Sequence, residues 1–387
     1  MRILISAGEA SGEMYGAQLI EALRRRDPSL EFFGVGGDRM RAAGCATIVD
    51  AKDLSVVGIT EIWSHLPKIW GLFGELIKAA DQRRPDLAVV IDSPAFNWRV
   101  ARAMRERGVP VVYYVCPQFW AWRQGRVRHL RRYVDKALVI FPFEEKFYRD
   151  RGVDAMFAGH PLADLPNPAV SRPDYALQRS LDPAKAWITL MPGSRVKEVR
   201  MNLPEMLKAA RQLGSKYEFL LPVAPTLDRR FVQSLIESAP SIHLVAEAPP
   251  ALANSRAGMI ASGTATVEAA LLGTPFVMVY RVSRLTYLLG RPRVKVPYFA
   301  MVNLIAGKEI VPELVQDAFT AENIAAQLNK ILPEGPARES MIAGLAEVRT
   351  RLEGSFSDSL QPVERAADII MKFLPAQSGV KTHSLQI

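Results

Sequence analysis

Runs of apolar residues long enough to form strands alternate with helical patterns along most of the chain. In the first half, helical spacing over stretches such as 12–26 and 96–107 separates apolar runs at 2–7, 31–37, 86–92, 110–115, 136–142 and 155–161. Most runs are apolar throughout rather than alternating, which is typical of parallel strands buried on both faces. The pattern therefore predicts a doubly wound α/β sheet.

A second α/β domain is predicted after residue 173. The segment 161–173 holds four prolines and no periodicity, which indicates an interdomain linker. The chain is predicted to be helical from about residue 317, and before that point further strands are predicted at 186–193, 218–224, 242–247, 258–263 and 275–280. We expect domains at 1–165 and 173–350, a helix at 351–374 that packs back on the first domain, and a disordered tail at 375–387.

Composition excludes several classes of protein. Hydrophobic residues make up 49% and charged residues 23% of the chain, which rules out a largely disordered protein. No run of uncharged apolar residues is long enough to predict a membrane span. Cys45 and Cys116 have no metal-site or disulfide spacing, and the N-terminus lacks the apolar core of a signal peptide. A reducing cytoplasm is therefore expected.

The positive charge is concentrated in one stretch. The chain carries 49 Lys and Arg against 40 Asp and Glu, a net charge of +9, and residues 99–136 alone hold ten basic and two acidic residues. Such a surplus predicts a negatively charged partner, which at this point is a nucleic acid, an anionic lipid surface or a phosphorylated substrate.

Two strand-to-helix junctions of the first domain are candidate ligand sites, because open α/β sheets bind ligands beyond the carboxyl ends of their strands. In residues 6–16, the small residues Gly8, Ser11 and Gly12 let backbone N–H groups approach an anion, or else the segment forms only a tight turn and helix cap. Asp92 ends a strongly apolar strand, where a carboxylate is costly to desolvate. It is either a general base or the N-cap of a helix that starts near Ala95.

The first junction of the second domain, residues 191–199, has the features of a phosphate site. Gly193 and Ser194 open a helix N-terminus, and Arg195 adds a guanidinium suited to bidentate phosphate contact. Glu198 is spaced to pair with Arg195 on the helix face. A purely structural cap would not need the arginine.

The other junction, residues 260–281, opens a helix made of small residues. Ser262, Gly263 and Thr264 leave backbone N–H groups exposed at its start, and Glu268 follows on the helix. A carboxylate there can accept hydrogen bonds from the two hydroxyls of a ribose; the alternative is an exposed helical glutamate.

Residues 54–77 combine an apolar helical face with few charges. That face consists of Ile62, Trp63, Leu66, Ile69, Trp70 and Phe73. A core helix is one interpretation, but tryptophan beside lysine on an apolar face is also typical of a helix at a membrane interface, which we favour. The basic run after residues 120–122 is either a solvated helix face or a contact for anionic headgroups, and its members are Arg123, Arg126, Arg128, Arg131 and Arg132.

Eight segments together resemble the lipid-A-disaccharide synthase family. They are GEASG (8–12), IDSPAFN (91–97), YVCPQFWAWRQGRV (114–127), FPFE (141–144), GHPLAD (159–164), LMPGSRVKEV (190–199), ASGTATVEAALLGTP (261–275) and VPYFAMVNLIAGKEIVPELVQ (296–316). The segments follow one another in family order from about residue 2 to residue 370, and the W-A-W-R and P-G-S-R runs make the combination specific.

The resemblance implies both a fold and a reaction. The family has two Rossmann-like doubly wound domains, the GT-B glycosyltransferase architecture, with C-terminal helices that cross back to the first domain. The implied reaction transfers 2,3-diacylglucosamine from UDP-2,3-diacylglucosamine to 2,3-diacylglucosamine 1-phosphate, forming a β-1,6-linked disaccharide 1-phosphate and UDP without a cofactor. The implied location is peripheral, on the cytoplasmic face of the inner membrane of a Gram-negative-type bacterium, and a homodimer is left open.

The resemblance also assigns roles to individual residues. Asp92 matches the family's essential carboxylate and is the candidate base for the acceptor 6-hydroxyl, and the remaining matches place Ser11, Arg195, Glu268, Arg281 and Asn303 at the nucleotide-sugar site. At Ala95 many members carry a second acidic residue, so a mechanism with two carboxylates is in doubt here.

Two predictions separate this interpretation from its alternatives. The chain has no D-x-D motif, so activity is predicted to be independent of metal and to survive EDTA. A UDP-N-acetylglucosamine 2-epimerase would leave the apolar face in residues 54–77 without a purpose, and a nucleic-acid-binding protein would not explain Asp92. We therefore expect the protein to co-sediment with anionic liposomes rather than bind RNA.

Overall fold

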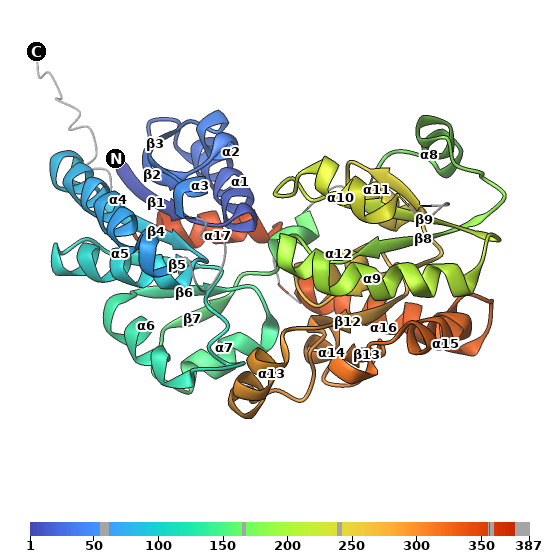
Figure 1. Ribbon diagram of the computed structural model, residues 1–387. Coiled ribbons are helices and arrows are strands. Elements are labelled where there is room, and N and C mark those ends of the chain that lie inside the picture. The colour runs from blue at the N-terminus through green and yellow to red at the C-terminus, as the bar shows by residue number, and fades with distance from the viewer. Residues whose placement is uncertain (55–61, 165–167, 238–241, 355, 357–359, 376–387) are drawn as a thin grey trace, which may run out of the picture. The chain divides into compact units, whose positions relative to one another are not determined.

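The computed structural model describes residues 1–387 except 55–61, 165–167, 238–241, 355, 357–359 and 376–387. It divides into two compact units, shown in Figure 1. The first unit comprises Met1–Phe119, Gln124–Pro161 and the C-terminal segment from Ser357, and the second comprises Trp120–Arg123 and Leu162–Phe356. The short excursion of Trp120–Arg123 into the second unit is not visible in the pattern of strands and helices along the chain.

The first unit is built on a parallel sheet. Its strands are β1 (Arg2–Ala7), β2 (Glu31–Gly36), β3 (Cys45–Asp50), β4 (Leu87–Ile91), β5 (Val111–Tyr114), β6 (Lys136–Val139) and β7 (Ala155–Phe157). Within the described residues they lie in the order β3-β2-β1-β4-β5-β6-β7. The side chains of β4 are buried along its whole length, because helices cover both faces of the sheet.

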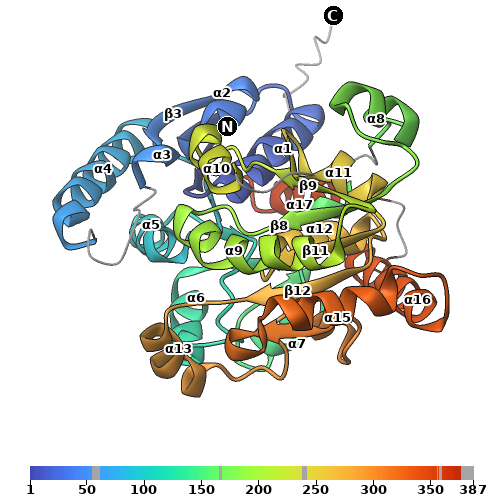
Figure 2. The ribbon, with the colours of Figure 1, turned by 45° about the vertical axis from the view of Figure 1, so that its right-hand side comes forward.

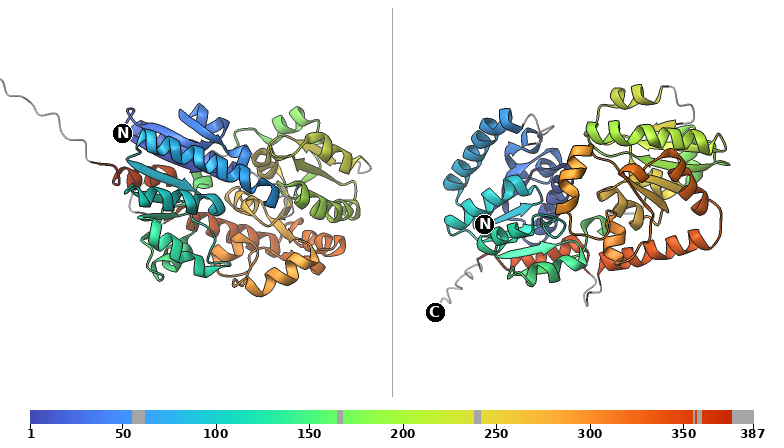
Figure 3. Two further views of the ribbon diagram at one scale, coloured as in Figure 1. Left: turned by 60° about the vertical axis from the view of Figure 1, so that its left-hand side comes forward. Right: turned by 60° about the horizontal axis from the view of Figure 1, so that its bottom comes forward.

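Helices of the first unit lie on both faces of this sheet. They are α1 (Ala10–Arg26), α2 (Asp38–Ala42), α3 (Ala51–Leu54), α4 (Ile62–Arg83), α5 (Pro94–Glu106), α6 (Val127–Tyr133), α7 (Pro142–Arg149) and α17 (Pro362–Met371), with the 3₁₀ turn η1 (Gln124–Arg126) before α6. Because strand order reverses beside β1, right-handed crossovers place α1 and α5 on opposite faces. Helix α17 packs on α1, whereas α4 and α5 run side by side (Figure 3).

The second unit repeats this arrangement. Its parallel strands are β8 (Ala186–Met191), β9 (Tyr217–Pro222), β10 (Ile242–Val245), β11 (Ala257–Ala261), β12 (Phe276–Tyr280) and β13 (Glu313–Val315). Their order within the described part of the chain is β10-β9-β8-β11-β12-β13, so strand order again reverses next to the first strand of the unit.

The helices of the second unit also form two layers, which Figure 2 shows. They are α8 (Arg172–Arg179), α9 (Val196–Leu213), α10 (Arg229–Ile236), α11 (Ala248–Asn254), α12 (Thr264–Leu271), α13 (Arg284–Gly290), α14 (Met301–Ala306), α15 (Ala321–Ile331) and α16 (Pro336–Glu353), with 3₁₀ turns η2 (Pro161–Asp164), η3 (Arg291–Arg293) and η4 (Gln316–Ala318). Helices α9 and α15 pack together, as do α12, α14 and α16. A hydrogen bond of 3.2 Å from Gln212 to Glu322 joins the first pair.

The pattern of apolar runs predicted the two sheets but missed one edge strand in each. Strand β3 has six residues but only Cys45 and Val49 are buried, and β13 has only three residues, so neither stands out as an apolar run. The helix expected at 351–374 is wrong as a single element, because α16 ends at Glu353 and α17 begins at Pro362. The tail expected at 375–387 lies almost entirely outside the described residues. No helix in the described part of the chain is both long and apolar enough to cross a bilayer.

Candidate active site

The junctions selected from the sequence lie at the reversal points of the two sheets. In the first unit, the β1–α1 loop and the β4–α5 turn leave neighbouring strands at the carboxyl edge. In the second, the β8–α9 and β11–α12 loops do the same. Loops at such a reversal point diverge to opposite faces of the sheet and leave a crevice where open α/β proteins bind ligands.

Asp92 stands in the β4–α5 turn with an unusual backbone. Asp92 and the following Ser93 have φ angles of 48° and 47°, in the left-handed region. The N-cap residue of α5 is Ser93, so the alternative in which Asp92 is the N-cap is wrong. Val115, which follows β5, also has a positive φ of 57° although it is β-branched. Such strain persists only where surrounding contacts enforce it, and it gathers at functional sites.

Two buried side chains hold the backbone of Asp92. The hydroxyl of Tyr113 donates to the Asp92 carbonyl oxygen at 2.7 Å, and Nδ2 of Asn97 donates to the same oxygen at 2.8 Å. Asn97 also donates to the Ile91 carbonyl and accepts a hydrogen bond of 2.6 Å from the Ser6 hydroxyl. Burial, followed by the charge of Asp92, raises the pKa of Tyr113 well above its usual value, so its hydroxyl stays a donor. These contacts form a clamp that sets the position of Asp92.

The β1–α1 loop approaches this turn closely. A Cβ atom on Gly8 would lie 2.6 Å from the Ser93 hydroxyl oxygen, so only glycine fits there. Ser11 lies in the first turn of α1, partly exposed. It therefore belongs to the first unit, whereas the other residues predicted to bind the UDP-sugar belong to the second.

In the β8–α9 loop, Glu198 occupies the donors expected to bind phosphate. Its Oε2 accepts hydrogen bonds from the backbone N–H of Ser194 at 3.0 Å and of Arg195 at 3.3 Å. Gly193 has a φ of 125°, and a Cβ there would lie 2.4 Å from the same carboxylate. The expected pair between Arg195 and Glu198 is present at 3.2 Å, with the Arg195 side chain 71% exposed. The carboxylate thus fills the anion position of the loop, and the guanidinium is the group presented to solvent.

The β11–α12 loop keeps its backbone donors open. Gly263 is the N-cap of α12 with a φ of 148°, and it supplies no side-chain cap. Among the described residues, no acceptor is bonded to the N–H of Thr264 or of Ala265. The Ser262 hydroxyl donates to the Phe299 carbonyl at 2.8 Å, so that side chain ties two loops together. The N-terminus of α12 therefore has both free donors and a favourable dipole for an anion.

Glu268 lies on α12, about one turn beyond these donors, and is only partly exposed. Burial raises the pKa of its carboxyl group from 4.5 to about 7. A carboxyl group poised in this range titrates near neutral pH, which is unusual for a helical glutamate and typical of functional sites. The exposed-glutamate alternative is therefore wrong.

Asn303 is buried and makes hydrogen bonds within the unit. Its Nδ2 donates to the Val311 carbonyl and to Glu313, each at 2.9 Å, and its Oδ1 accepts from the N–H groups of Ile310 and Val311. Glu313 also accepts from the N–H of Phe299 at 2.8 Å. Asn303 thus braces the loop that Ser262 contacts, and a direct contact with the sugar stays a prediction.

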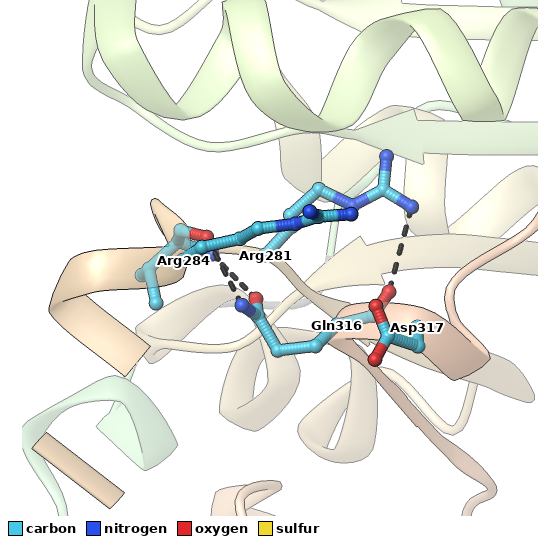
Figure 4. Close-up of a pocket in the computed structure, with 5 residues that line it drawn as sticks. Arg281, Arg284, Gln316 and Asp317 are labelled. Carbon is cyan, nitrogen blue, oxygen red and sulfur yellow. Dashed lines mark hydrogen bonds between the residues drawn. The ribbon is translucent and has the colours of Figure 1, made fainter. Parts of the chain in front are cut away.

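Arg281 lines a pocket at the carboxyl ends of β12 and β13 (Figure 4). Its guanidinium donates to the carbonyl oxygens of Gln316 and Phe319 and lies 4.6 Å from the Phe319 ring centroid. Gln316 has a φ of 53°, and its amide group bonds both the N–H and the carbonyl of Val282. Arg284, whose side chain extends into the same pocket, is a further cationic group there. Gln316, which the sequence pattern did not select, therefore contacts both Arg281 and Val282 of the pocket lining.

The aromatic face predicted in residues 54–77 is only partly described. The side chains of Ile62, Trp63 and Leu66 lie outside the described residues, and Ile69 is partly buried. Trp70 on α4 is 55% exposed, and its ring centroid lies 6.0 Å from that of Phe73. Phe73 in turn packs on the buried Phe96 of α5 at 6.0 Å. Helix α4 thus buries one face and exposes a large indole to solvent. This arrangement fits neither a helix that is wholly in the core nor a helix with a fully polar surface.

The five arginines of the basic run are exposed but belong to different units. Arg126, at the end of η1, and Arg128, Arg131 and Arg132 of α6 lie in the first unit, whereas Arg123 lies in the second. Arg123 stacks on Trp122 at 4.2 Å with a φ of 56°. A contact of all five with a single headgroup layer stays a prediction.

Comparisons with known proteins agree on the family. A family model described as lipid-A-disaccharide synthetase matches residues 3–358. The chain is 53% identical over 375 residues to the lipid-A-disaccharide synthase of Koribacter versatilis (strain Ellin345), covering 96% of this chain and 98% of that protein. It is 49% identical over 394 residues to the one from Acidobacterium capsulatum, covering 98% of each.

Solved structures show the same fold at low identity. A UDP-GlcNAc 2-epimerase from Neisseria meningitidis bound to UDP-GlcNAc has a TM-score of 0.65 at 13% identity, covering 96% of this chain and 99% of that one. A calicheamicin glycosyltransferase has a TM-score of 0.60 at 17% identity, covering 96% and 98%. The architecture is that of GT-B glycosyltransferases and the related epimerases. With the family match over most of its length, the chain belongs to the lipid-A-disaccharide synthase family and is a glycosyltransferase.

Proposed function

We propose that the chain transfers 2,3-diacylglucosamine from UDP-2,3-diacylglucosamine to the 6-hydroxyl of 2,3-diacylglucosamine 1-phosphate. The products are UDP and the β-1,6-linked disaccharide 1-phosphate. Membership of the family supports a UDP-sugar donor and a lipid acceptor. The observation that carries the mechanism is Asp92, which the Tyr113 and Asn97 clamp holds at the reversal point of the first sheet.

Asp92 acts as general base in a single displacement. Its carboxylate takes the proton of the acceptor 6-hydroxyl as that oxygen attacks the anomeric carbon of the donor, and the bond from this carbon to UDP breaks on the opposite side. Configuration therefore inverts from α to β in one step, and one carboxylate suffices. Ala95, in the first turn of α5, is exposed and has no carboxylate, which leaves this role to Asp92.

The second unit stabilises the leaving diphosphate. Negative charge grows on the β-phosphate as the bond to the sugar breaks, and donors already aimed at it lower the barrier. The open N–H groups of Thr264 and Ala265 suit this task, as does the exposed Arg195 guanidinium. Because Glu198 already bonds the N–H groups of Ser194 and Arg195, we assign the anion contact in that loop to the Arg195 side chain. Glu268 accepts the ribose hydroxyls.

The lipid substrates require access to a membrane. We propose that the aromatic surface of α4 around Trp70, with the exposed arginines of α6, lies on the anionic cytoplasmic face of the inner membrane. Tryptophan favours the interface between acyl chains and headgroups, and arginine favours the anionic headgroups themselves.

The central test is Asp92→Asn in an assay with radiolabelled UDP-diacylglucosamine. We expect kcat to fall by about 10²- to 10⁴-fold, the range for loss of a general base. Asp150→Asn is the matched control, since Asp150 is an exposed carboxylate paired with Lys146 on α7. Unchanged UDP binding by Asp92→Asn would show that the variant is folded. A rate within threefold of wild type would remove Asp92 from the mechanism.

A further inference from the structure

Arg99 is held between two tryptophans of the first unit. Its guanidinium carbon lies 4.7 Å from the ring centroid of Trp98 on α5 and 5.4 Å from that of Trp70 on α4. Trp70 rests on Phe73, which packs against the buried Phe96. The group formed by Trp70, Arg99 and Trp98 is therefore anchored in the core through Phe73, although Trp70 is exposed to solvent.

The guanidinium reaches back along α5 by one turn, towards the start of the helix. One of its nitrogens, Nη1, donates to the Ala95 carbonyl oxygen in the first turn of the helix. Helix α5 begins at Pro94, directly after the turn formed by Asp92 and Ser93. Because a helix rises by about 1.5 Å per residue, this contact places the charge within about one helical turn of the start of α5.

Arg99 differs in its pairing from the other arginines of α5 and from Arg107, the residue after its last turn. Arg102 pairs with Glu106 at 2.8 Å, Arg105 with Asp135 at 2.5 Å, and Arg107 with Asp81 at 2.6 Å. Among the residues that the structure describes, no carboxylate lies within ion-pair distance of Arg99, which is only partly exposed. Its positive charge is thus oriented by aromatic rings and one carbonyl oxygen, and it is not neutralised.

The surroundings of Arg99 add further capacity to bind an anion. His129 of α6 lies with its ring centroid 5.2 Å from that of Trp98, so the stack continues as Trp70, Arg99, Trp98 and His129. The neighbouring Arg128 is exposed. A guanidinium stacked on aromatic faces keeps its in-plane N–H donors available and loses little freedom when it binds, so it suits a phosphate oxygen pair.

We propose that Arg99, fixed between Trp70 and Trp98, binds the phosphate monoester of the acceptor sugar. This rests on the proposed function, in which the acceptor is a hexosamine 1-phosphate. In that molecule the reacting 6-hydroxyl and the phosphate stand at opposite ends of one pyranose ring. With the hydroxyl at Asp92, a ring lying along the first turn of α5 brings its phosphate to the Arg99 guanidinium.

A membrane phospholipid carries a phosphate of the same chemistry, so the test separates the two sources. Arg99→Gln and Arg99→Lys are compared with Arg102→Gln, a matched change on the same helix. The acceptor is dispersed in neutral detergent without a bilayer. We expect Arg99→Gln to raise the KM for the acceptor at least tenfold, while the KM for the UDP-sugar and kcat change less than threefold. Arg99→Lys should fall between, because it keeps the charge without the planar fork.

Acyl-free glucosamine 1-phosphate provides a second readout that does not involve lipid. It should inhibit wild type and Arg102→Gln competitively with the acceptor, and its inhibition constant should rise at least tenfold in Arg99→Gln. Unchanged constants in both assays would overturn the proposal. So would unchanged detergent kinetics combined with loss of Arg99→Gln from phosphatidylglycerol vesicles, which would make the bound phosphate that of a membrane lipid.

The Arg99 test can fail or succeed independently of the Asp92 test. If Asp92→Asn keeps full activity, the assignment of the base fails, yet the acceptor KM of Arg99→Gln still reports the phosphate contact. If Arg99→Gln melts more than about 5 °C below wild type, Arg99→Lys carries the comparison, because it preserves the stacked side chain. A wild-type acceptor KM in Arg99→Lys together with wild-type inhibition by glucosamine 1-phosphate would then overturn the proposed contact between the Arg99 guanidinium and the phosphate.

Discussion

Asn97 connects three parts of the first-unit site through one side-chain amide. It accepts a hydrogen bond from Ser6 on β1 and donates to the carbonyl oxygens of Ile91 and Asp92. The amide is completely buried, so none of these groups can turn to water instead. Its bonds to the turn help to keep Asp92 in the left-handed region, where a non-glycine residue costs about 1–3 kcal/mol.

Asn97→Ala should therefore reduce both stability and turnover. Loss of the amide leaves buried groups unpaired, which should lower the free energy of unfolding by about 1–3 kcal/mol. It should also lower kcat more than it raises either KM, because Asp92 loses its orientation rather than the substrate losing a contact. Urea unfolding and steady-state kinetics measure these effects. Asn254→Ala, which removes one hydrogen bond of 2.9 Å to Pro250, is the control, and an unaltered kcat in Asn97→Ala would argue against the clamp.

Glu268 should make UDP binding depend on pH. Burial raises the pKa of this carboxyl group to about 7, and a ribose diol prefers the ionised form because both hydroxyls are donors. Calorimetry should show the Kd for UDP falling about tenfold between pH 6 and pH 8 in wild type, relative to Glu268→Gln, which removes the ionisation and leaves the titration of UDP itself. Parallel pH profiles in the two proteins would exclude Glu268 from the nucleotide site.

The raised pKa of Glu268 also makes the free energy of unfolding depend on pH. The folded protein holds the Glu268 proton more tightly than the unfolded chain does, so the stabilising effect is present below about pH 4.5 and lost as pH rises through about 7. Compared with Glu268→Gln, wild type should lose at most about 3 kcal/mol of unfolding free energy across this window.

In the proposed function, helix α4 is the element expected to contact the membrane. Its inner face is fixed by buried residues such as Leu76 and Ala80, whereas Trp70 faces solvent. Trp70→Ser, alone or with Trp63→Ser, should release the protein from anionic vesicles. For Trp70→Ser alone the melting temperature should stay close to that of wild type, since the exposed Trp70 indole contributes little to the core. Co-sedimentation measures release, and Trp122→Ser changes another exposed tryptophan, 45% exposed and in the second unit, as a control. Undiminished sedimentation of the Trp70 variant would count against this surface.

Helix α17, the last helix of the described residues, belongs to the first unit and packs on α1. Glu364 and Asp368 of α17 pair with Arg26 of α1, and Arg365 donates to the Ala158 carbonyl at 2.9 Å. Burial alone would raise the pKa of Glu364, but hydrogen bonds from Arg25 and Arg26 outweigh it and lower the pKa. The first unit therefore depends on residues more than 300 positions from its first helix.

Glu364→Gln tests this closure. At neutral pH we expect it to lower the free energy of unfolding by about 1–3 kcal/mol, because a charged partner of Arg26 is lost. A lowered folded pKa means that the stabilisation is present above the usual pKa of a glutamate and is lost as pH falls through the folded value. The difference between wild type and variant should accordingly shrink in acid. Thermal unfolding at several pH values measures it, with Asp150→Asn as an exposed-pair control, and a constant difference down to low pH would contradict the account.

Continuous apolar runs predicted most strands of both sheets, and polar residues at their ends pointed to Asp92, Arg195 and Glu268. Asn97 and Gln316 were not selected, although both lie within recognised segments, because a lone amide in a helix or loop carries no local sign of its partners. For Glu198, the sequence predicted only the ion pair with Arg195. Its bonds to two backbone N–H groups depend on how the loop closes around Gly193.

Periodicity, junction residues and family motifs were thus sufficient for the α/β class, the family and the candidate base, since each is encoded over a few consecutive residues. The tertiary structure was needed to bring Ser6, Asp92, Asn97 and Tyr113 into one clamp and to stack Trp70, Arg99, Trp98 and His129. It also decided which charges are neutralised, and left Arg99 without a carboxylate among the described residues while its neighbours on α5 are paired. Burial and pairing depend on groups from distant parts of the chain, so no local pattern can specify them.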